Sequence, residues 1–138
     1  MVIDLHVLWD QINREHWAGR LPTPQLEFGR PDSEPVHAAT RWLPGGGLLV
    51  RVSPESASVP GLNQVRWTRD VLRHESIHVA MGRPRVGDGH GRGFRRHARR
   101  IGRQLGLPAP VSFRSWPATV RPETYYTTIE IGARSWNN

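Results

Sequence analysis

Cysteine is absent from the 138 residues of this chain. Its absence excludes a disulfide framework, a thiol nucleophile and any zinc ribbon or finger built on cysteine. Because nothing points to an oxidising compartment, we expect an intracellular, cytoplasmic protein. Lysine is absent too, so all 19 basic residues are arginines, and a GC-rich coding sequence is a sufficient explanation for that choice.

Long hydrophobic runs are also missing. No apolar stretch approaches the length of a membrane span, so we expect no membrane-spanning segment. Residues 1–6 lack the basic region and apolar run of a secretory signal, so we expect no secretion. Hydrophobic residues make up 37% of the chain, an ordinary share for a globular protein, and the length fits one compact domain.

The positive charge is concentrated in one segment. The formal net charge is +7, from 19 basic and 12 acidic residues. Residues 83–103 hold eight arginines and one acid, Asp88, whereas the rest of the chain holds eleven of each. The excess charge therefore forms a local patch, which is either a surface for a polyanion or a solvated face.

Hydrophobic periodicity and turn residues divide the chain into short helices and strands. The expected elements are a helix over residues 4–18, a strand over 25–28, a β-hairpin of 36–43 and 48–53 around the tip 44–47, a helix from an N-cap at Asn63 to Met81, a helix over 92–105 and a strand over 124–131. This order predicts the α+β class, with a small antiparallel sheet.

The segment His74-Glu75-Ser76-Ile77-His78 lies in the middle of the second expected helix and has the pattern H-E-x-x-H. Two histidines four residues apart project from one face of a helix, so both imidazoles can bind one ion. Glu75 lies about 100° around the helix from His74, so it can reach a metal-bound water without being a ligand. This arrangement is typical of zinc-dependent hydrolysis, although two ordinary surface or core histidines give the same spacing.

A catalytic zinc site of this kind needs a third protein ligand. The histidines before the motif, at positions 6, 16 and 37, have no convincing geometry. His90 lies among glycines directly before the third helix, where the backbone can approach the metal and turn back into a helix. His97 lies inside that helix and is expected to be an ordinary partly buried or surface residue. We therefore favour His90 as the third ligand.

Taken together, these motifs resemble the Spartan/SprT-like family of zinc metallopeptidases, which includes proteases of DNA–protein crosslinks. The resemblance covers about residues 5–105. It rests on three segments. The first helix ends in Asn13-Arg-Glu-His-Trp17-Ala-Gly19-Arg-Leu21-Pro22, and the H-E-x-x-H segment His74–His78 follows a hairpin. A His-Gly-x-x-Phe element, His90-Gly-Arg-Gly-Phe94, opens the next helix.

The resemblance implies a zincin-like single domain over residues 1–108, in which the active-site helix is followed by a second, basic helix. It implies one Zn²⁺ per chain, with His74, His78 and His90 as ligands and Glu75 as the general base. The chain departs from many members because it has no C-terminal cysteine-rich ribbon, and its Pro-rich segment and C-terminal strand or tail, residues 109–138, match nothing in the family.

Arginines occupy the face of the third helix that lies opposite its apolar positions. They are Arg92, Arg95, Arg96, Arg99, Arg100 and Arg103. No acid interrupts this helix to pair with them, and the arginine fork suits phosphate oxygens, so the face is a candidate for contacts with a DNA backbone without sequence preference. A solvated face remains the alternative.

The sequence therefore predicts a zinc metalloendopeptidase acting on DNA-associated proteins, in DNA–protein crosslink repair. The alternative is a DNA-binding or assembly protein that retains a zinc site with little protease activity. Residues 48–53 are a candidate edge strand for holding an extended peptide substrate, with an ordinary hairpin strand as the alternative. Tyr125, Tyr126 or an arginine near the site are candidates for stabilising the tetrahedral intermediate.

Overall fold

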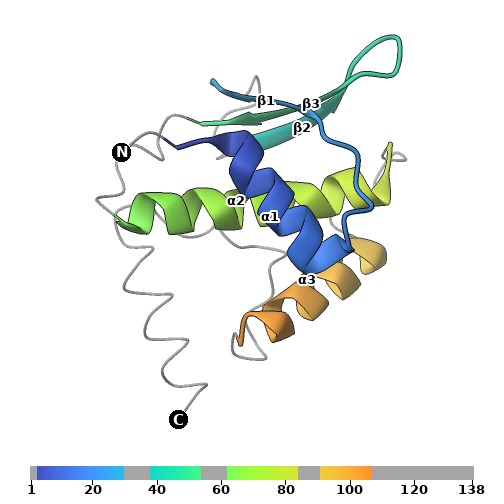
Figure 1. The fold of residues 1–138 in the computed structure, drawn as a ribbon. Coiled ribbons are helices and arrows are strands. Elements are labelled where there is room, and N and C mark those ends of the chain that lie inside the picture. Colours follow the sequence, from blue (N-terminus) through green and yellow to red (C-terminus); the bar gives the residue numbers. More distant parts are fainter. Residues whose placement is uncertain (1–2, 30–37, 54–61, 84–90, 107–138) are drawn as a thin grey trace.

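The computed structural model describes residues 3–29, 38–53, 62–83 and 91–106. In this part of the chain it contains three helices and one three-stranded mixed sheet, which confirms the α+β class. The elements are α1 (Leu5–Trp17), β1 (Gln25–Phe28), β2 (Ala38–Trp42), β3 (Leu48–Val52), α2 (Leu62–Met81) and α3 (Arg92–Gln104). Figure 1 shows the sheet on one side of α2 and α3 on the other, with α1 crossing α2. Helix α2, which carries the H-E-x-x-H segment, is thus the central element.

Helix α1 begins and ends as its sequence predicts. The Asp4 side chain caps its start by accepting hydrogen bonds from the backbone N–H groups of His6 and Val7, at 3.0 and 3.3 Å, which satisfies donors that have no partner in the first turn. At the other end, Ala18 and Gly19 have φ angles of 55° and 73°. Ala18 is the left-handed C-cap residue, and its backbone N–H donates to the Asn13 carbonyl oxygen, so the chain leaves the helix here and continues through Gly19, which adopts a positive φ without a steric penalty.

The sheet differs from the expected antiparallel one. Strand β3 lies in the centre, in the order β1-β3-β2, and it pairs antiparallel with β2 but parallel with β1. The hairpin is therefore confirmed, and the purely antiparallel sheet is wrong. A four-residue strand carries no local signal of its direction, and residues 29–47, which include β2, give the chain enough length to return parallel to β1.

The central place of β3 also overturns the expectation that residues 48–53 hold a peptide by edge pairing. Both sides of β3 are occupied, by β1 and by β2, so its backbone groups are already used in the ladder. Edge pairing needs a row of unpaired N–H and C=O groups. Among the described strands, β1 and β2 are the edges.

Helix α2 starts one residue earlier than predicted. Asn63 lies inside its first turn, because the helix begins at Leu62, so Asn63 is not the N-cap. In the sequence, Pro60 and Gly61 stand directly before the helix, and both are poor residues for a helix interior. Leucine propagates a helix well, so the helix extends back as far as these two residues allow.

The hydrophobic core lies where α2 meets α1, α3 and the sheet. Its fully buried members include Trp9 and Ile12 of α1, Val50 of β3 and Leu72 of α2. Helix α3 contributes the apolar face predicted from its sequence, since Phe94, Ala98 and Ile101 are buried. This packing covers α2 from several sides and fixes it as the scaffold of the candidate site.

Some expected features lie outside the described residues. They are the strand over 124–131, the whole of segment 109–138, the start of the predicted hairpin at 36–37 and the loop that carries His90. Within the described residues, no helix is long and apolar enough to cross a membrane.

Candidate metal centre

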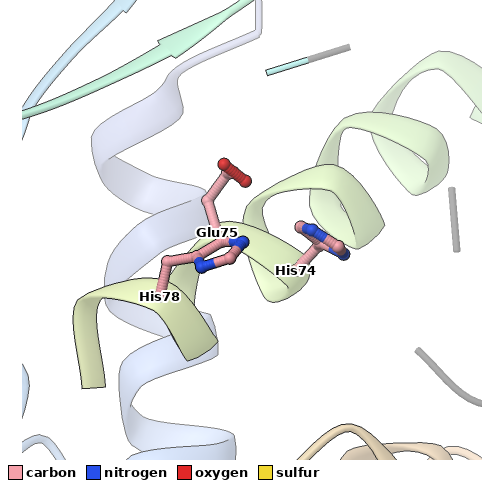
Figure 2. A group of neighbouring side chains, drawn as sticks. All are labelled: His74, Glu75 and His78. Carbon is pink, nitrogen blue, oxygen red and sulfur yellow. The ribbon is translucent and has the colours of Figure 1, made fainter. Parts of the chain in front are cut away.

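The side chains of His74, Glu75 and His78 come together on α2. One nitrogen of each imidazole and one carboxylate oxygen all lie within 4.8 Å of one another. Figure 2 shows the two imidazoles side by side along the helix, with the Glu75 carboxylate extending away from them. The spacing therefore does what the sequence predicts: it brings three groups that bind metals to one place.

Phe94 of α3 packs against both imidazoles. Its ring centroid lies 5.0 Å from that of His74 and 4.7 Å from that of His78, and the two imidazoles are 5.2 Å apart in an edge-to-face arrangement. Phe94 is 1% exposed, so its ring is itself held firmly by the core. Tilted aromatic pairs at these distances attract one another, which restricts the rotation of both histidine rings.

The first turn of α3 lies close to the C-terminal end of α2. A Cβ atom added at Gly93 would stand 2.5 Å from the Met81 methyl group, closer than such atoms approach in folded proteins. A larger residue at position 93 would have to push the Met81 side chain aside. Met81 is exposed and its methyl group is the end of a flexible side chain, so this movement would cost little.

Glu75 lies in a poorly solvated position near the sheet. Its side chain belongs to a residue that is 3% exposed, and the Thr40 hydroxyl of β2 lies 3.4 Å from Glu75 Oε1 as a hydrogen-bond donor. Burial raises the pKa of Glu75 to about 8, while the bond from Thr40 acts in the opposite direction. At neutral pH the carboxyl group of the metal-free chain is therefore mostly protonated, and a bound cation beside it would favour the ionised form that accepts a proton.

Ser76, inside the H-E-x-x-H segment, anchors α2 to α1. The Trp17 indole donates a hydrogen bond of 3.0 Å to Ser76 Oγ, and this hydroxyl donates to the Arg73 carbonyl oxygen at 2.6 Å. Ser76 is fully buried. The residue that the motif leaves variable thus fixes the helix against the end of α1.

A buried polar network on the same side joins all three helices. Arg73 Nε donates to His16 Nε2 at 3.0 Å, and Arg73 also pairs with Asp70. Because His16 Nε2 accepts this bond, the neutral ring carries its proton on Nδ1, which donates to Gln104 Oε1 at 2.6 Å. Burial, together with the charge of Arg73, lowers the pKa of His16, so the ring stays neutral. His16 therefore has a structural role, away from the metal-binding group.

The arginines of α3 fall into two groups. Arg100 is tied to α1, because it donates a hydrogen bond of 2.7 Å to the His16 carbonyl oxygen and lies 4.6 Å from the centre of the Trp17 ring. The other five are not tied to α1 in this way. Arg95 is half-buried, and the remaining four are exposed: Arg92, Arg96, Arg99 and Arg103. In the described part of the chain, none of these five forms a salt bridge with an acid.

The structure thus brings together His74, Glu75 and His78, whereas His90, Tyr125 and Tyr126 lie outside the described residues. His97 is half-buried against Trp17, with ring centroids 5.0 Å apart, as expected for a residue that is not a ligand. The sequence reasoning missed Thr40, which no spacing connects with the motif. It also missed the Asp70–Arg73 pair, although opposite charges three residues apart on a helix were a usable signal.

No protein-family model, curated protein or solved structure matches the chain. The resemblance to the SprT-like family therefore rests on the sequence motifs and stays a prediction.

Proposed function

We propose that this chain is a SprT-like zinc metalloendopeptidase that hydrolyses peptide bonds. The observation that carries the proposal is the group of His74, Glu75 and His78, whose ligand atoms lie within 4.8 Å of one another. A core histidine pair would need no carboxylate beside it. Here a carboxylate lies beside the two imidazoles, where the charge of a bound cation would favour its ionised, proton-accepting form.

The donor set fits zinc. Imidazole nitrogens are ordinary zinc ligands, and His74 and His78 project from one face of α2 with their rings held by Phe94. Together with His90 they would complete a site with three histidines and an open position. Zinc bound in such a site lowers the pKa of a water molecule to about 7 and polarises the peptide carbonyl.

Glu75 supplies the proton acceptor for the reaction. Its carboxylate is held beside the imidazoles on the side that faces the sheet (Figure 2). In this position it would take the proton from the attacking water and pass it to the leaving amine, which is the ordinary work of a general base and then a general acid. Its surroundings exclude bulk water, since the residue is 3% exposed, and proton transfer is therefore confined to the bound substrate.

The test is cleavage of a denatured protein such as casein by the zinc-loaded chain. We expect hydrolysis that a chelator abolishes and that added zinc restores, and we expect Glu75→Gln to lower the rate about 10²- to 10⁴-fold. A chain that binds zinc but shows no cleavage under these conditions would contradict the protease and favour the alternative, a DNA-binding or assembly protein with a zinc site.

We further propose that the substrates are proteins associated with DNA. The exposed arginines of α3 lie on the helix whose first turn packs on the candidate ligands, and no described acid neutralises them. Arginine contacts with phosphates bind DNA without reading its sequence, and they weaken as salt displaces the protein. DNA held on this face would concentrate attached proteins around the domain that carries the candidate metal centre.

A pair of variants with equal charge tests this assignment. Arg96→Ala with Arg99→Ala removes two exposed charges from α3, and Arg14→Ala with Arg66→Ala removes two from exposed positions on α1 and α2. We expect the α3 variant to bind DNA more weakly and to lose about one unit of the log–log salt slope for each phosphate contact removed. Equal losses in the two variants would show that only net charge matters.

A further inference from the structure

Thr40 is placed by the sheet so that its side chain faces α2. It lies in the middle of the edge strand β2 and pairs with Val50 of β3. Cross-strand partners share one face of a sheet, and Val50 is fully buried in the core that α2 helps to form. Thr40 is itself half-buried. The strand register therefore directs this hydroxyl toward the helix that carries the candidate metal centre.

The Thr40 hydroxyl is the hydrogen-bond donor that the described residues supply to Glu75. The two oxygens, Thr40 Oγ1 and Glu75 Oε1, lie 3.4 Å apart. The Thr40 hydroxyl donates this bond, as the proposed role of Glu75 requires, because the ionised carboxylate that acts as a base only accepts hydrogen bonds. This separation is long for a hydrogen bond between two oxygens. Catalytic hydrogen bonds in free enzymes are commonly long and shorten when substrate is bound.

We propose that Thr40 is a positioning residue for Glu75, holding Oε1 from the sheet so that the other oxygen, Oε2, is presented to the attacking water. This proposal rests on the proposed function. Without the hydroxyl, the carboxylate can rotate about its last side-chain bonds. Small errors in the placement of a catalytic group lower rates strongly, with losses of about 10²-fold for displacements near 1 Å.

The role requires a hydroxyl and a branched Cβ for different reasons. The hydroxyl holds Glu75, whereas the branched side chain suits a β-strand and packs beside Val50. Valine keeps the branch and the volume but has no hydroxyl, so Thr40→Val isolates the hydrogen bond. Serine keeps the hydroxyl and lacks the methyl group, so Thr40→Ser tests rescue.

The experiment measures kcat, KM and zinc content for wild type, Thr40→Val and Thr40→Ser, with Thr23→Val as the control. Thr23 is an exposed residue in the connection between α1 and β1, so the control makes the same chemical change outside the strands, at a residue with no recorded contact to Glu75. We expect Thr40→Val to keep its zinc and its KM and to lose about 10- to 100-fold in kcat, because the proposed role of Glu75 is in proton transfer and not in substrate binding. Thr40→Ser should recover to within about threefold of wild type, and the control should behave as wild type.

The possible outcomes separate the two proposals. If wild type cleaves and Thr40→Val has the same kcat, the positioning role is wrong while the protease stands. If Thr40→Ser is as slow as Thr40→Val, the hydroxyl is not the cause, and the role is again wrong. If wild type holds zinc and cleaves nothing, the proposed function and this role fall together. Thr40→Ala also removes the hydroxyl and carries the same expectation should the valine fit poorly.

Discussion

Replacing Phe94 by leucine should loosen the candidate metal site more than it loosens the fold. The ring contacts both imidazoles, at 5.0 and 4.7 Å, and it is 1% exposed. Leucine keeps most of the apolar area but removes both ring contacts. Aromatic pairs contribute about 0.5–1.5 kcal/mol each beyond their burial, so two pairs amount to about 1–3 kcal/mol.

Part of this energy should appear as lost zinc affinity. With Phe94 gone, His74 and His78 can leave the orientation that binds metal. Replacing a residue that orients metal ligands commonly lowers metal affinity about 10- to 100-fold, so we expect Phe94→Leu to bind zinc at least about tenfold more weakly. The assay is competition for zinc between the protein and a chelating dye, alongside urea unfolding of the metal-free chain.

Ile101→Val is the matched control. Ile101 is fully buried on the same face of α3, and no ring contact joins it to the histidines. The change should lower the free energy of unfolding by about 0.5–1.5 kcal/mol and leave zinc affinity unchanged. If Phe94→Leu loses stability but binds zinc as tightly as wild type, Phe94 only fills the core, and the reasoning about the imidazoles is refuted.

Three further changes test other parts of the account. His90→Ala should lose bound zinc in elemental analysis, and unchanged occupancy would show that another residue is the third ligand. Asn13→Ala should lower the free energy of unfolding by about 2 kcal/mol, because Asn13 makes two hydrogen bonds of 3.0 Å with the Leu21 backbone; a loss below about 0.5 kcal/mol would contradict this. The pKa of His16 is lowered in the folded chain, so the unfolded state takes up this proton first. His16 should therefore contribute a loss of stability as the pH falls below about 6.5, by up to about 1.4 kcal/mol per unit, while Glu75 and Asp70, whose pKa values are raised, contribute in the opposite direction. His16→Gln, which still offers an acceptor to Arg73, should show a smaller loss between pH 7 and 5 in urea titrations, and equal slopes would refute the assignment.

The helices were predictable because their signals are local. Apolar residues at a spacing of three and four mark the buried face of α3, and Phe94, Ala98 and Ile101 are buried there. Gly19 ends α1 through its positive φ angle, which the sequence also indicates. The start of α2 was misplaced because Asn63 has the residue type of a cap but lies inside the first turn.

The sheet was harder to predict because its pairing depends on contacts between distant segments. The glycine-rich tip correctly gave the hairpin of β2 and β3. The direction of β1 was not predictable, since Gln25–Phe28 pairs with whichever neighbour the tertiary fold supplies. For the same reason β3 was taken as a candidate edge strand, although it lies between two others.

The site shows the same division between local and long-range information. The spacing of His74 and His78 alone brings their imidazoles together, because four residues make about one helical turn. Phe94, from the His-Gly-x-x-Phe element, reaches the same place from α3. Thr40 reaches it from a strand, and nothing in the sequence around Thr40 points there. Sequence reasoning therefore found the groups to which the proposed chemistry is assigned and missed Thr40, which we propose as the positioning residue for Glu75.

The most direct test of the central claim is the zinc content of the Glu75→Gln variant, measured on the same sample as its cleavage rate. The account makes Glu75 the base and the histidines the ligands, so it predicts one zinc per chain, as in wild type, with hydrolysis reduced about 10²- to 10⁴-fold. Loss of zinc from the variant would make Glu75 a ligand. Cleavage at the wild-type rate would remove Glu75 from the mechanism, and either result would contradict the account.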